Sequence, residues 1–255
     1  MKHVVFGAGA VGSTLARHLA GLGERVVAVS RSGRPVDGAE AVAGDAADRE
    51  FMASAVEGAD VVYQCLNPPY HRWPELFPPL QRSVMDAARA AGAKLVSFEN
   101  LYMYGPTGGE PVTEDLPYAA TGRKGRVRGQ MAAELLDAHT AGDLRVAIGR
   151  ASDFFGPGAL VTHMGERVFY PVLAGKKAQV FGDPDQPHTF TYVPDIAAGL
   201  ATLGMSDAGD GQAWHLPNPE TLTTREFIGR VAAAAGTGGG VSAMPKPYLS
   251  VPAEK

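Results

Sequence analysis

The chain has 255 residues, of which 45% are hydrophobic and 20% charged, with 23 basic and 27 acidic side chains. This length supports one large or two small cores, and the composition excludes an intrinsically disordered or a collagen-like chain. The formal net charge of −4 argues against nucleic acid as the main partner, because that binding depends on a basic surface.

Cysteine content and hydropathy narrow the class of protein further. Cys65 is the only cysteine, so no disulfide within the chain and no cysteine-based zinc site is expected, and the reducing cytoplasm is the expected location. The N-terminus lacks a secretory cleavage pattern, and no apolar run is long enough to span a membrane. No metal site is expected, and the sequence contains neither a P-loop nor a GxSxG motif.

The first 150 residues alternate short β-rich runs with amphipathic stretches. Strands that alternate with helices predict an α/β fold with a doubly wound parallel sheet, covered by helices on both faces. Strands are expected at 4–6, 25–29, 40–43, 60–65, 94–98 and 144–149, and helices at 13–22, 48–57, about 75–91 and about 124–140.

The pattern changes after residue 150. A Gly/Pro-rich loop is expected at 153–158, a short strand between turns within 175–190, and a helix at 191–204 with Pro194 near its first turn. A strand is expected at 212–218. The last helix, 223–236, is expected to begin with a Thr223 cap, supported by Glu226, and to end at Gly236.

The first strand is followed directly by a glycine-rich turn, Gly7-Ala8-Gly9-Ala10-Val11-Gly12. Gly7 permits a tight turn, Gly9 lets a pyrophosphate approach the backbone, and Gly12 lets the helix and the strand pack closely. The helix N-terminus offers free N–H groups to phosphates. We therefore expect a dinucleotide at this turn, including Val11; the alternative is a glycine-rich turn that serves packing alone.

The end of the second strand predicts which dinucleotide binds. NAD-binding proteins usually place an acidic side chain there, to accept a hydrogen bond from the ribose. This chain has Ser30-Arg31-Ser32, with Arg34 close by. Because a guanidinium group suits a 2′-phosphate, NADP(H) is favoured over NAD(H). The alternative is that both arginines are solvated loop charges.

Several short motifs follow one another in order along nearly the whole chain. Together they resemble the extended short-chain dehydrogenase/reductase family, also called the NAD-dependent epimerase/dehydratase family. Beside the glycine turn and the Ser30-Arg31-Ser32 segment, the motifs are Gly44-Asp45, Tyr104-Gly105-Pro106, Phe155-Gly156-Pro157-Gly158 and Tyr192-Val193-Pro194-Asp195.

The resemblance implies a Rossmann-type domain with a small C-terminal substrate lobe. The expected division is residues 1–158 for the Rossmann domain and 159–255 mainly for the lobe, with 188–218 returning to the Rossmann sheet. The resemblance also implies that Asp45 reaches the adenine and that Leu66 and Asn67 lie beside the nicotinamide. A homodimer paired through the helices at about 75–91 and 124–140 is expected.

The family's catalytic residues are missing. Asn100 stands where the family has Ser or Thr, and alignment by spacing puts Lys124 at the position of the catalytic Tyr and Arg128 at that of the Lys. Residues i and i+4 share a helix face, so we hypothesise that Lys124 is the general acid and that Arg128 holds ribose or substrate. The alternatives are a solvated basic helix start, or Tyr118 acting from just upstream.

Other side chains are expected around the same site. Asn100, Tyr102 and Tyr104 would line one wall and orient a carbonyl. The segment after the fourth strand supplies Tyr70 and Trp73 for stacking on substrate and His71 as an acid or base; alternatively, it is a proline-stiffened loop whose aromatic rings pack together.

His188 bears on the substrate. Nucleotide-sugar members of the family commonly have Arg at this place, and a neutral imidazole holds a diphosphate less well than a guanidinium. We therefore expect a small organic substrate other than a nucleotide sugar, bound partly by His188.

The leading interpretation is an NADP(H)-dependent oxidoreductase or epimerase-like enzyme that lacks the usual Tyr-x-x-x-Lys pair. The alternatives are a non-catalytic NADP(H)-binding sensor or regulator, and a redox-neutral isomerase or lyase on the same fold. NADPH consumption with carbonyl compounds is expected only for the first.

Overall fold

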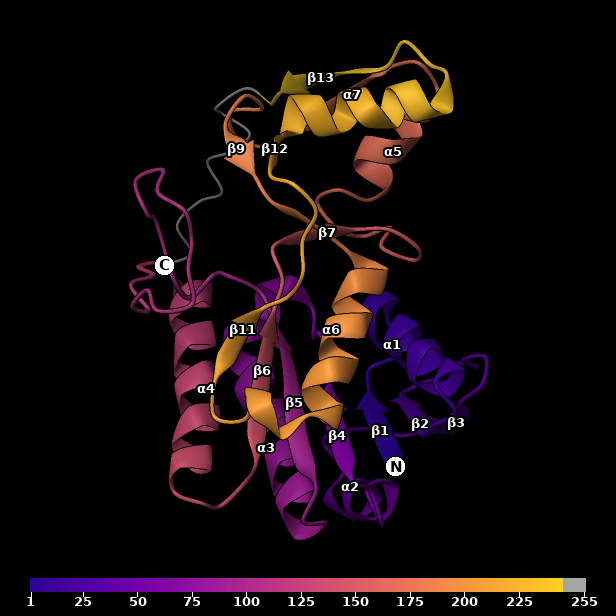
Figure 1. The fold of residues 1–255 in the computed structure, drawn as a ribbon, viewed down its shortest axis with the longest axis vertical. Helices are drawn as coiled ribbons and strands as arrows, with labels where there is room; N and C mark the ends of the chain where they lie inside the picture. Colours follow the sequence, from indigo (N-terminus) through magenta and orange to yellow (C-terminus); the bar gives the residue numbers. More distant parts are fainter. Residues whose placement is uncertain (245–255) are drawn as a thin grey trace. The chain divides into compact units, whose positions relative to one another are not determined.

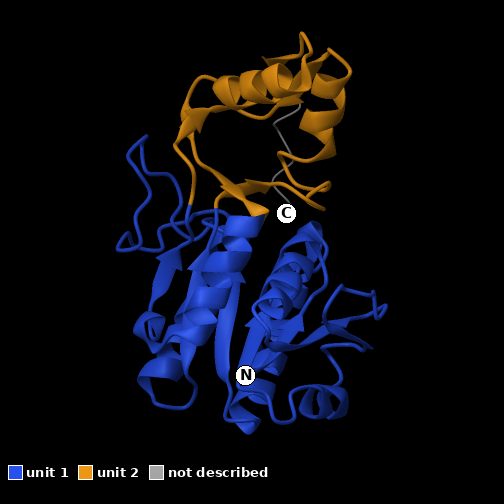
Figure 2. Ribbon diagram, turned by 45° about the vertical axis from the view of Figure 1, so that its right-hand side comes forward, with its two compact units in different colours: residues 1–151, 194–217 blue, residues 152–193, 218–255 orange. Residues whose placement is uncertain are grey.

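The computed structural model describes residues 1–244, which form two compact units (Figure 2). Unit 1 comprises residues 1–151 and 194–217, and the described part of unit 2 comprises 152–193 and 218–244. The sequence placed the corresponding boundaries at 158 and at 188–218. Residues 245–255, the end of the expected substrate lobe, lie outside the described residues.

Unit 1 contains a seven-stranded sheet in the order β11-β6-β5-β4-β1-β2-β3 (Figure 1). Every neighbouring pair of strands is parallel. The chain winds outward from β1 in both directions, so the strand order reverses between β1 and β4, where open α/β sheets bind ligands. The strands are β1 (Lys2–Phe6), β2 (Arg25–Ser30), β3 (Glu40–Ala43), β4 (Val61–Gln64), β5 (Lys94–Glu99), β6 (Val146–Arg150) and β11 (Ala213–His215).

Helices cover both faces of this sheet. Val4 and Phe6 of β1 and Val62 of β4 belong to the apolar cluster that α2, α3 and α4 complete on one face. Tyr63 points to the other face, where α6 packs so closely that a Cβ at Gly204 would overlap its hydroxyl; α1 lies on this face too (Figure 1). The helices are α1 (Ala10–Gly21), α2 (Arg49–Ala55), α3 (Trp73–Ala90), α4 (Arg123–Thr140) and α6 (Val193–Met205), with short 3₁₀ turns η1 (Tyr70–Arg72) and η2 (Asp207–Gly209).

Two glycines near the start of α4 are poor helix formers, and the structure explains them by close packing. A Cβ at Gly125 would lie 2.6 Å from the carbonyl oxygen of Tyr102, and one at Gly129 would lie 3.3 Å from Cβ of Tyr118. The loop between β5 and α4 therefore crosses the first turns of the helix closely enough to exclude a side chain at Gly125 and to leave little room for one at Gly129.

Unit 2 has a small core of its own beneath two helices. Phe190, Phe227 and Ile228 are buried in it, together with Val168 and Val172 of α5. Its elements are β7 (Asp153–Phe155), α5 (Glu166–Leu173), β8 (Lys177–Val180), β9 (Pro187–His188), β10 (Phe190–Tyr192), β12 (Leu222–Thr223), α7 (Thr224–Ala235) and β13 (Gly240–Ala243).

The doubly wound α/β fold expected from the sequence is confirmed. So is the capping box of the last helix: Thr223 and Glu226 exchange hydrogen bonds, and Gly236 ends the helix with a left-handed φ of +65°. The expected helix at 191–204 was wrong at its start. Residues 190–192 pair with β7 as strand β10, because aromatic and β-branched side chains favour a strand, and α6 begins only at Val193.

Candidate active site

In the turn between β1 and α1, neighbouring atoms leave no room for a side chain at Gly7 or Gly12 but leave open space at Gly9. Gly7 has a φ of +104°, and a side chain there would strike the carbonyl of Cys65 at the end of β4, while a Cβ at Gly12 would overlap the carbonyl oxygen of Gly7. Around Gly9, in contrast, no described atom lies within 4 Å of an added Cβ. The turn therefore packs tightly on the sheet and exposes its backbone at one point.

The same point is the N-terminus of α1. Gly9 is the N-cap, no described side chain caps the helix, and the first turn contains no acidic residue. The first backbone bond of the helix joins Ser13 N–H to the Gly9 carbonyl oxygen, so the N–H groups of Ala10, Val11 and Gly12 precede the helical ladder. Free amides and a positive dipole end favour an anion, and phosphate fits both.

The end of β2 carries two exposed arginines. Ser30 Oγ accepts a hydrogen bond from the Arg34 backbone N–H at 3.1 Å, which fixes the turn. The guanidinium groups of Arg31 and Arg34 are exposed and form no ion pair with another residue of 1–244. Asp45, at the end of β3, accepts a hydrogen bond from Ala47 N–H at 3.0 Å, which leaves one carboxylate oxygen outside this turn.

The segment after β4 is braced by Trp73. Its indole N–H donates to Asn67 Oδ1 and to the Pro68 carbonyl oxygen, each at 3.1 Å, and its ring packs edge-on against Phe77. Trp73 is only 8% exposed, which differs from the surface for stacking on substrate that the sequence suggested. Leu66 packs against the core of unit 1.

Lys124 lies among aromatic side chains. Its Nζ is 4.4 Å from the ring centroid of the exposed Tyr70, and that ring packs edge-on against Trp73 and Tyr102. The structure thus places the expected general acid on Tyr70, which packs against two further expected residues. His71 is exposed on η1 beside Tyr70, and Asn100 Oδ1 accepts a hydrogen bond from Tyr102 N–H at 3.2 Å.

Arg128 does not lie beside Lys124 as a second accessible cation. Its side chain is 2% exposed and ion-pairs with Glu99 at 3.4 Å, and the guanidinium sits 4.5 Å from the Phe77 ring centroid. Burial lowers the pKa of Arg128 from its ordinary value, against the attraction of Glu99. The expected contact of Arg128 with ribose or substrate is therefore not available in this conformation.

Sequence reasoning missed a buried charge cluster at the carboxyl ends of β5 and β6. Glu99 accepts from Arg150 Nε at 3.2 Å and faces Arg128 from its other oxygen, so one fully buried carboxylate serves two guanidinium groups. Burial lowers the pKa of Arg150, but Glu99 and the hydroxyl of Tyr118 outweigh that effect and raise it overall. The sequence did contain a signal for this cluster, because Glu99 and Arg150 directly follow two predicted buried strands.

Tyr104 belongs to this cluster rather than to an open wall. It is 2% exposed, and its hydroxyl accepts from Arg150 Nη1 at 2.6 Å and lies 3.0 Å from His215 Nε2. Burial raises the pKa of Tyr104 and lowers that of His215, so both groups are neutral near pH 7. Tyr118, at the surface of the cluster, accepts from Arg150 Nη2 at 2.5 Å.

His188 lies in unit 2, where its Nε2 is 3.1 Å from Asp153 Oδ2. Burial raises the pKa of Asp153, but the hydrogen bond to His188 and the nearby imidazoles lower it overall, so the carboxylate is charged. The imidazole has an anionic partner within its own unit.

Among residues 1–244 no cluster of metal-ligating side chains occurs, and no helix of that part is long and apolar enough to cross a membrane.

The model of one protein family, described as the NAD dependent epimerase/dehydratase family, matches residues 4–215. No curated protein matches the sequence. Solved structures that resemble the chain include the epimerase Mth375 from Methanothermobacter thermautotrophicus, with 19% identity over 99% of this chain and 82% of that one and a TM-score of 0.83.

Two further similar structures were solved with NAD bound. One is a UDP-glucose 4-epimerase from Thermus thermophilus in complex with NAD, with 21% identity over 95% of this chain and 86% of that one and a TM-score of 0.75. The other is a dTDP-glucose 4,6-dehydratase from Streptomyces venezuelae with NAD bound, with 20% identity over 96% and 85% of the two chains and a TM-score of 0.77. At these identities the similarity concerns the fold.

Proposed function

The chain belongs to the NAD-dependent epimerase/dehydratase family of enzymes, and we propose that it is an NADP(H)-dependent oxidoreductase or epimerase-like enzyme. Its substrate in this proposal is a small organic molecule other than a nucleotide sugar. The observation that carries the proposal is the β1–α1 turn, which is closed by backbone at Gly7 and Gly12 and open at Gly9, at the uncapped end of α1.

The residues at this end of the sheet fit a nicotinamide dinucleotide. The backbone around Gly7, Gly9, Val11 and Gly12 would hold the pyrophosphate, because an added Cβ meets open space only at the middle glycine. Asp45 would accept from the adenine, and Leu66 and Asn67 would lie on the nicotinamide side. When bound, the nicotinamide supplies or accepts a hydride.

Arg31 and Arg34 support the preference for the phosphorylated dinucleotide. Both are exposed at the end of β2, and neither is paired within residues 1–244. A 2′-phosphate would supply the missing anion, and a charge-assisted hydrogen bond contributes about 1.5–3 kcal/mol. An unphosphorylated ribose offers these guanidinium groups no charge.

The preference is tested by titrating NADPH and NADH against Arg31→Ala and Arg34→Ala, with the fluorescence of the reduced dinucleotide as the readout. Each substitution is expected to weaken NADPH binding about 10-fold and to leave NADH binding within about 2-fold. Arg25→Ala, at the opposite end of the same strand, is the matched control. Equal affinity of the unmodified protein for the two dinucleotides would contradict the preference.

For the proton that accompanies hydride transfer, we propose Lys124. Lys124 is half-buried, with its ammonium group over the Tyr70 ring, and that ring packs edge-on against Tyr102. In carbonyl reduction the Nζ–H bond of Lys124 would break and its proton would go to the carbonyl oxygen, while the bound dinucleotide would supply the hydride to the carbonyl carbon. Asn100 is proposed to orient the carbonyl, and His71, next to Tyr70 on η1, is proposed as a further acid or base.

Lys124→Met tests this role. Turnover of a carbonyl substrate is expected to fall by about 10²-fold or more, with NADPH affinity unchanged. Arg123→Met, which removes a neighbouring exposed cation, is expected to retain activity. If Lys124→Met retains activity and Tyr118→Phe loses it, the proton donor is the phenol held by Arg150 instead.

The choice of substrate rests on His188. In unit 2 its imidazole is already paired with Asp153, and an imidazole holds a diphosphate less well than a guanidinium does. NADPH oxidation is therefore expected with uncharged carbonyl compounds, and no turnover is expected with UDP-glucose or dTDP-glucose. Efficient turnover of either nucleotide sugar would contradict this part of the proposal.

A second candidate is a non-catalytic NADP(H) sensor, and one observation favours it. Helix α4 contains no tyrosine, and Arg128, at the expected lysine position, is sequestered by Glu99. Tight NADPH binding without oxidation by any carbonyl compound would favour this candidate.

We also propose a cytoplasmic homodimer formed through α3 and α4. Size-exclusion chromatography with light scattering tests this oligomeric state.

A further inference from the structure

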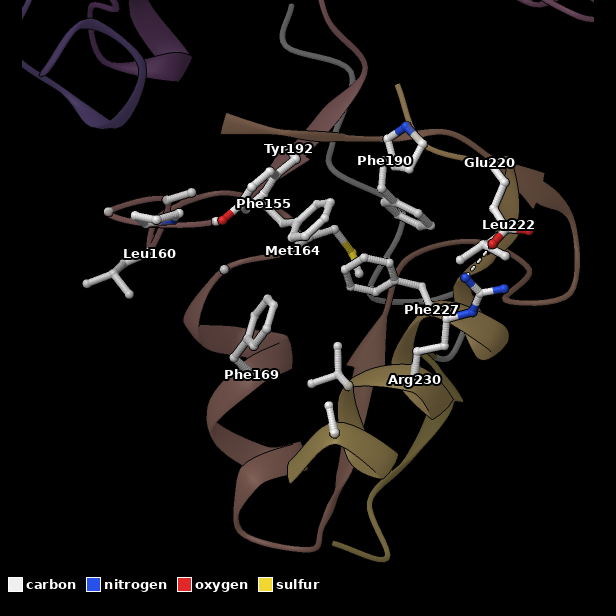
Figure 3. Close-up of a pocket in the computed structure, with 18 residues that line it drawn as sticks. Phe155, Leu160, Met164, Phe169, Phe190, Tyr192, Glu220, Leu222, Phe227 and Arg230 are labelled. Carbon is white, nitrogen blue, oxygen red and sulfur yellow. Dashed lines mark hydrogen bonds and ion pairs between the residues drawn. The ribbon is translucent and has the colours of Figure 1, made fainter. Parts of the chain in front are cut away.

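Unit 2 contains a cavity of about 710 Å³ (Figure 3). Its walls come from the loop after β7, from α5 and β10, and from the segment that leads through β12 into α7. All of its described lining residues belong to this unit. The described lining residues are Phe155–Leu160, Met164, Gly165, Phe169, Phe190, Tyr192, Pro219, Glu220, Leu222, Phe227, Arg230, Val231 and Ala234.

The walls are apolar and rich in aromatic rings. Phe227 stands at the centre, with its ring centroid 4.9 Å from that of Phe155 and 4.6 Å from that of Phe190. Phe155 in turn contacts Tyr192, with 5.3 Å between the ring centroids. Because these rings hold one another in place, the aromatic wall is formed before any ligand arrives.

The charges at the cavity cancel. Among the described lining residues only Glu220 and Arg230 carry charge, and Arg230 Nη1 donates to Glu220 Oε1 at 2.5 Å (Figure 3). Both side chains are more than half exposed, 59% for Arg230 and 64% for Glu220. A phosphorylated ligand would find no unpaired cation among these residues.

The loop on one side of the cavity is constrained by close contacts. Gly156 has a φ of +127°, and a Cβ there would lie 2.9 Å from the ring of Tyr192. A Cβ at Gly165 would overlap the carbonyl oxygen of Leu160. This closely packed loop nevertheless leaves Leu160 49% exposed and Val161 95% exposed, so apolar surface continues outward from the cavity.

We infer that this cavity binds an uncharged, largely apolar molecule or group with at least one ring. Its volume is in the range of pockets that enclose drug-sized ligands, about 300–1,000 Å³. Ring-on-ring packing and the absence of an unpaired charge in the described lining select against nucleotides. That this molecule is the substrate of the redox reaction rests on the proposed function; the binding site itself does not.

The inference is tested with the neutral fluorescent dye N-phenyl-1-naphthylamine. Ala234 of α7 lines the cavity, whereas its neighbour Ala233 is also exposed but lies outside the described lining. Ala234→Phe puts a large ring into the cavity, and Ala233→Phe makes the same change on the neighbouring position of the helix. Both variants are first checked for unchanged thermal unfolding.

The unmodified protein and Ala233→Phe are expected to bind one dye molecule saturably. Ala234→Phe is expected to bind the dye at least about 10-fold more weakly. UDP at millimolar concentration is expected not to displace the dye. Equal dye affinity in all three proteins, or displacement by UDP, would overturn the inference. NADPH titration of the same samples separates the apolar binding site from the proposed redox function. If the protein binds the dye but not NADPH, the proposed function is contradicted and the binding site is retained.

Discussion

Gly9 and Gly12 are the same residue type in opposite surroundings. At Gly12 any Cβ would overlap the Gly7 carbonyl oxygen, whereas at Gly9 it would enter open space. Gly9 therefore leaves room for a ligand, and Gly12 allows the close contact between helix and strand. Stability and binding are expected to separate between these two positions.

Gly12→Ala is expected to lower the free energy of unfolding by about 1–3 kcal/mol, in the range of overpacked sites, because backbone must move to admit the methyl group. Gly9→Ala is expected to change stability by about 1 kcal/mol or less and to weaken NADPH binding about 10-fold or more. Urea unfolding and NADPH titration of both variants measure this. If Gly9→Ala binds NADPH normally, the pyrophosphate does not lie over this residue.

Glu99 is the residue on which the buried charge cluster depends. Its fully buried carboxylate faces Arg128 and Arg150, and removing it would leave two guanidinium groups without an anion. Breaking a buried ion pair from one side costs about 3–5 kcal/mol.

Glu99→Gln is accordingly expected to lower the free energy of unfolding by about 3–5 kcal/mol, measured by urea unfolding at neutral pH. The control is Glu134→Gln, which breaks the ion pair between Glu134 and the exposed Arg82 and is expected to cost less than about 1 kcal/mol. Similar losses in the two variants would show that the cluster contributes no more stability than an exposed ion pair.

The sequence predicted the backbone geometry of the candidate site where immediate neighbours determine it. The glycine turn is the example, because its position after a strand predicts a tight turn at Gly7 and close packing at Gly12, and the structure has both. Arg128 is the opposite case: the spacing of four residues from Lys124 indicated a shared face, but Glu99, far away in sequence, decides that its guanidinium is buried. Pairing between distant segments is not visible in a single sequence.

At the scale of elements, the start of α7 shows where local pattern suffices. Thr223 and Glu226 form the reciprocal bonds of a capping box, as the spacing predicted. By contrast, residues 191–192 were predicted to begin a helix and instead pair with β7. That strand depends on a partner almost forty residues earlier in the chain, which local periodicity does not reveal.

Thr223→Ala removes the cap of α7. The side-chain acceptor for Glu226 N–H is lost, and such substitutions cost about 1 kcal/mol. We expect a small decrease in the stability of unit 2, detected as faster amide hydrogen exchange in α7, with exchange in α4 unchanged. Thr223→Ser keeps the oxygen and is expected to retain protection; equal loss in both variants would assign the effect to the lost methyl group.

At the scale of the whole molecule, the residues with proposed roles are distributed over both units. Unit 1 supplies the glycine turn, the exposed arginines and Lys124, and unit 2 supplies the apolar cavity. The parallel sheet of unit 1 followed from alternating strands and helices, because that alternation has few other solutions. The cavity was not predicted, since its rings come from segments that lie far apart in the chain.

The most direct measurement is a calorimetric titration of the unmodified protein with NADPH and with NADH, alongside its thermal unfolding. We expect one NADPH per chain, binding about 10-fold or more tighter than NADH, and an unfolding temperature that rises with NADPH concentration, because a ligand of the native state stabilises it. If neither dinucleotide releases heat or shifts unfolding, the open glycine at the start of α1 does not bind a cofactor, and the proposed redox function is contradicted.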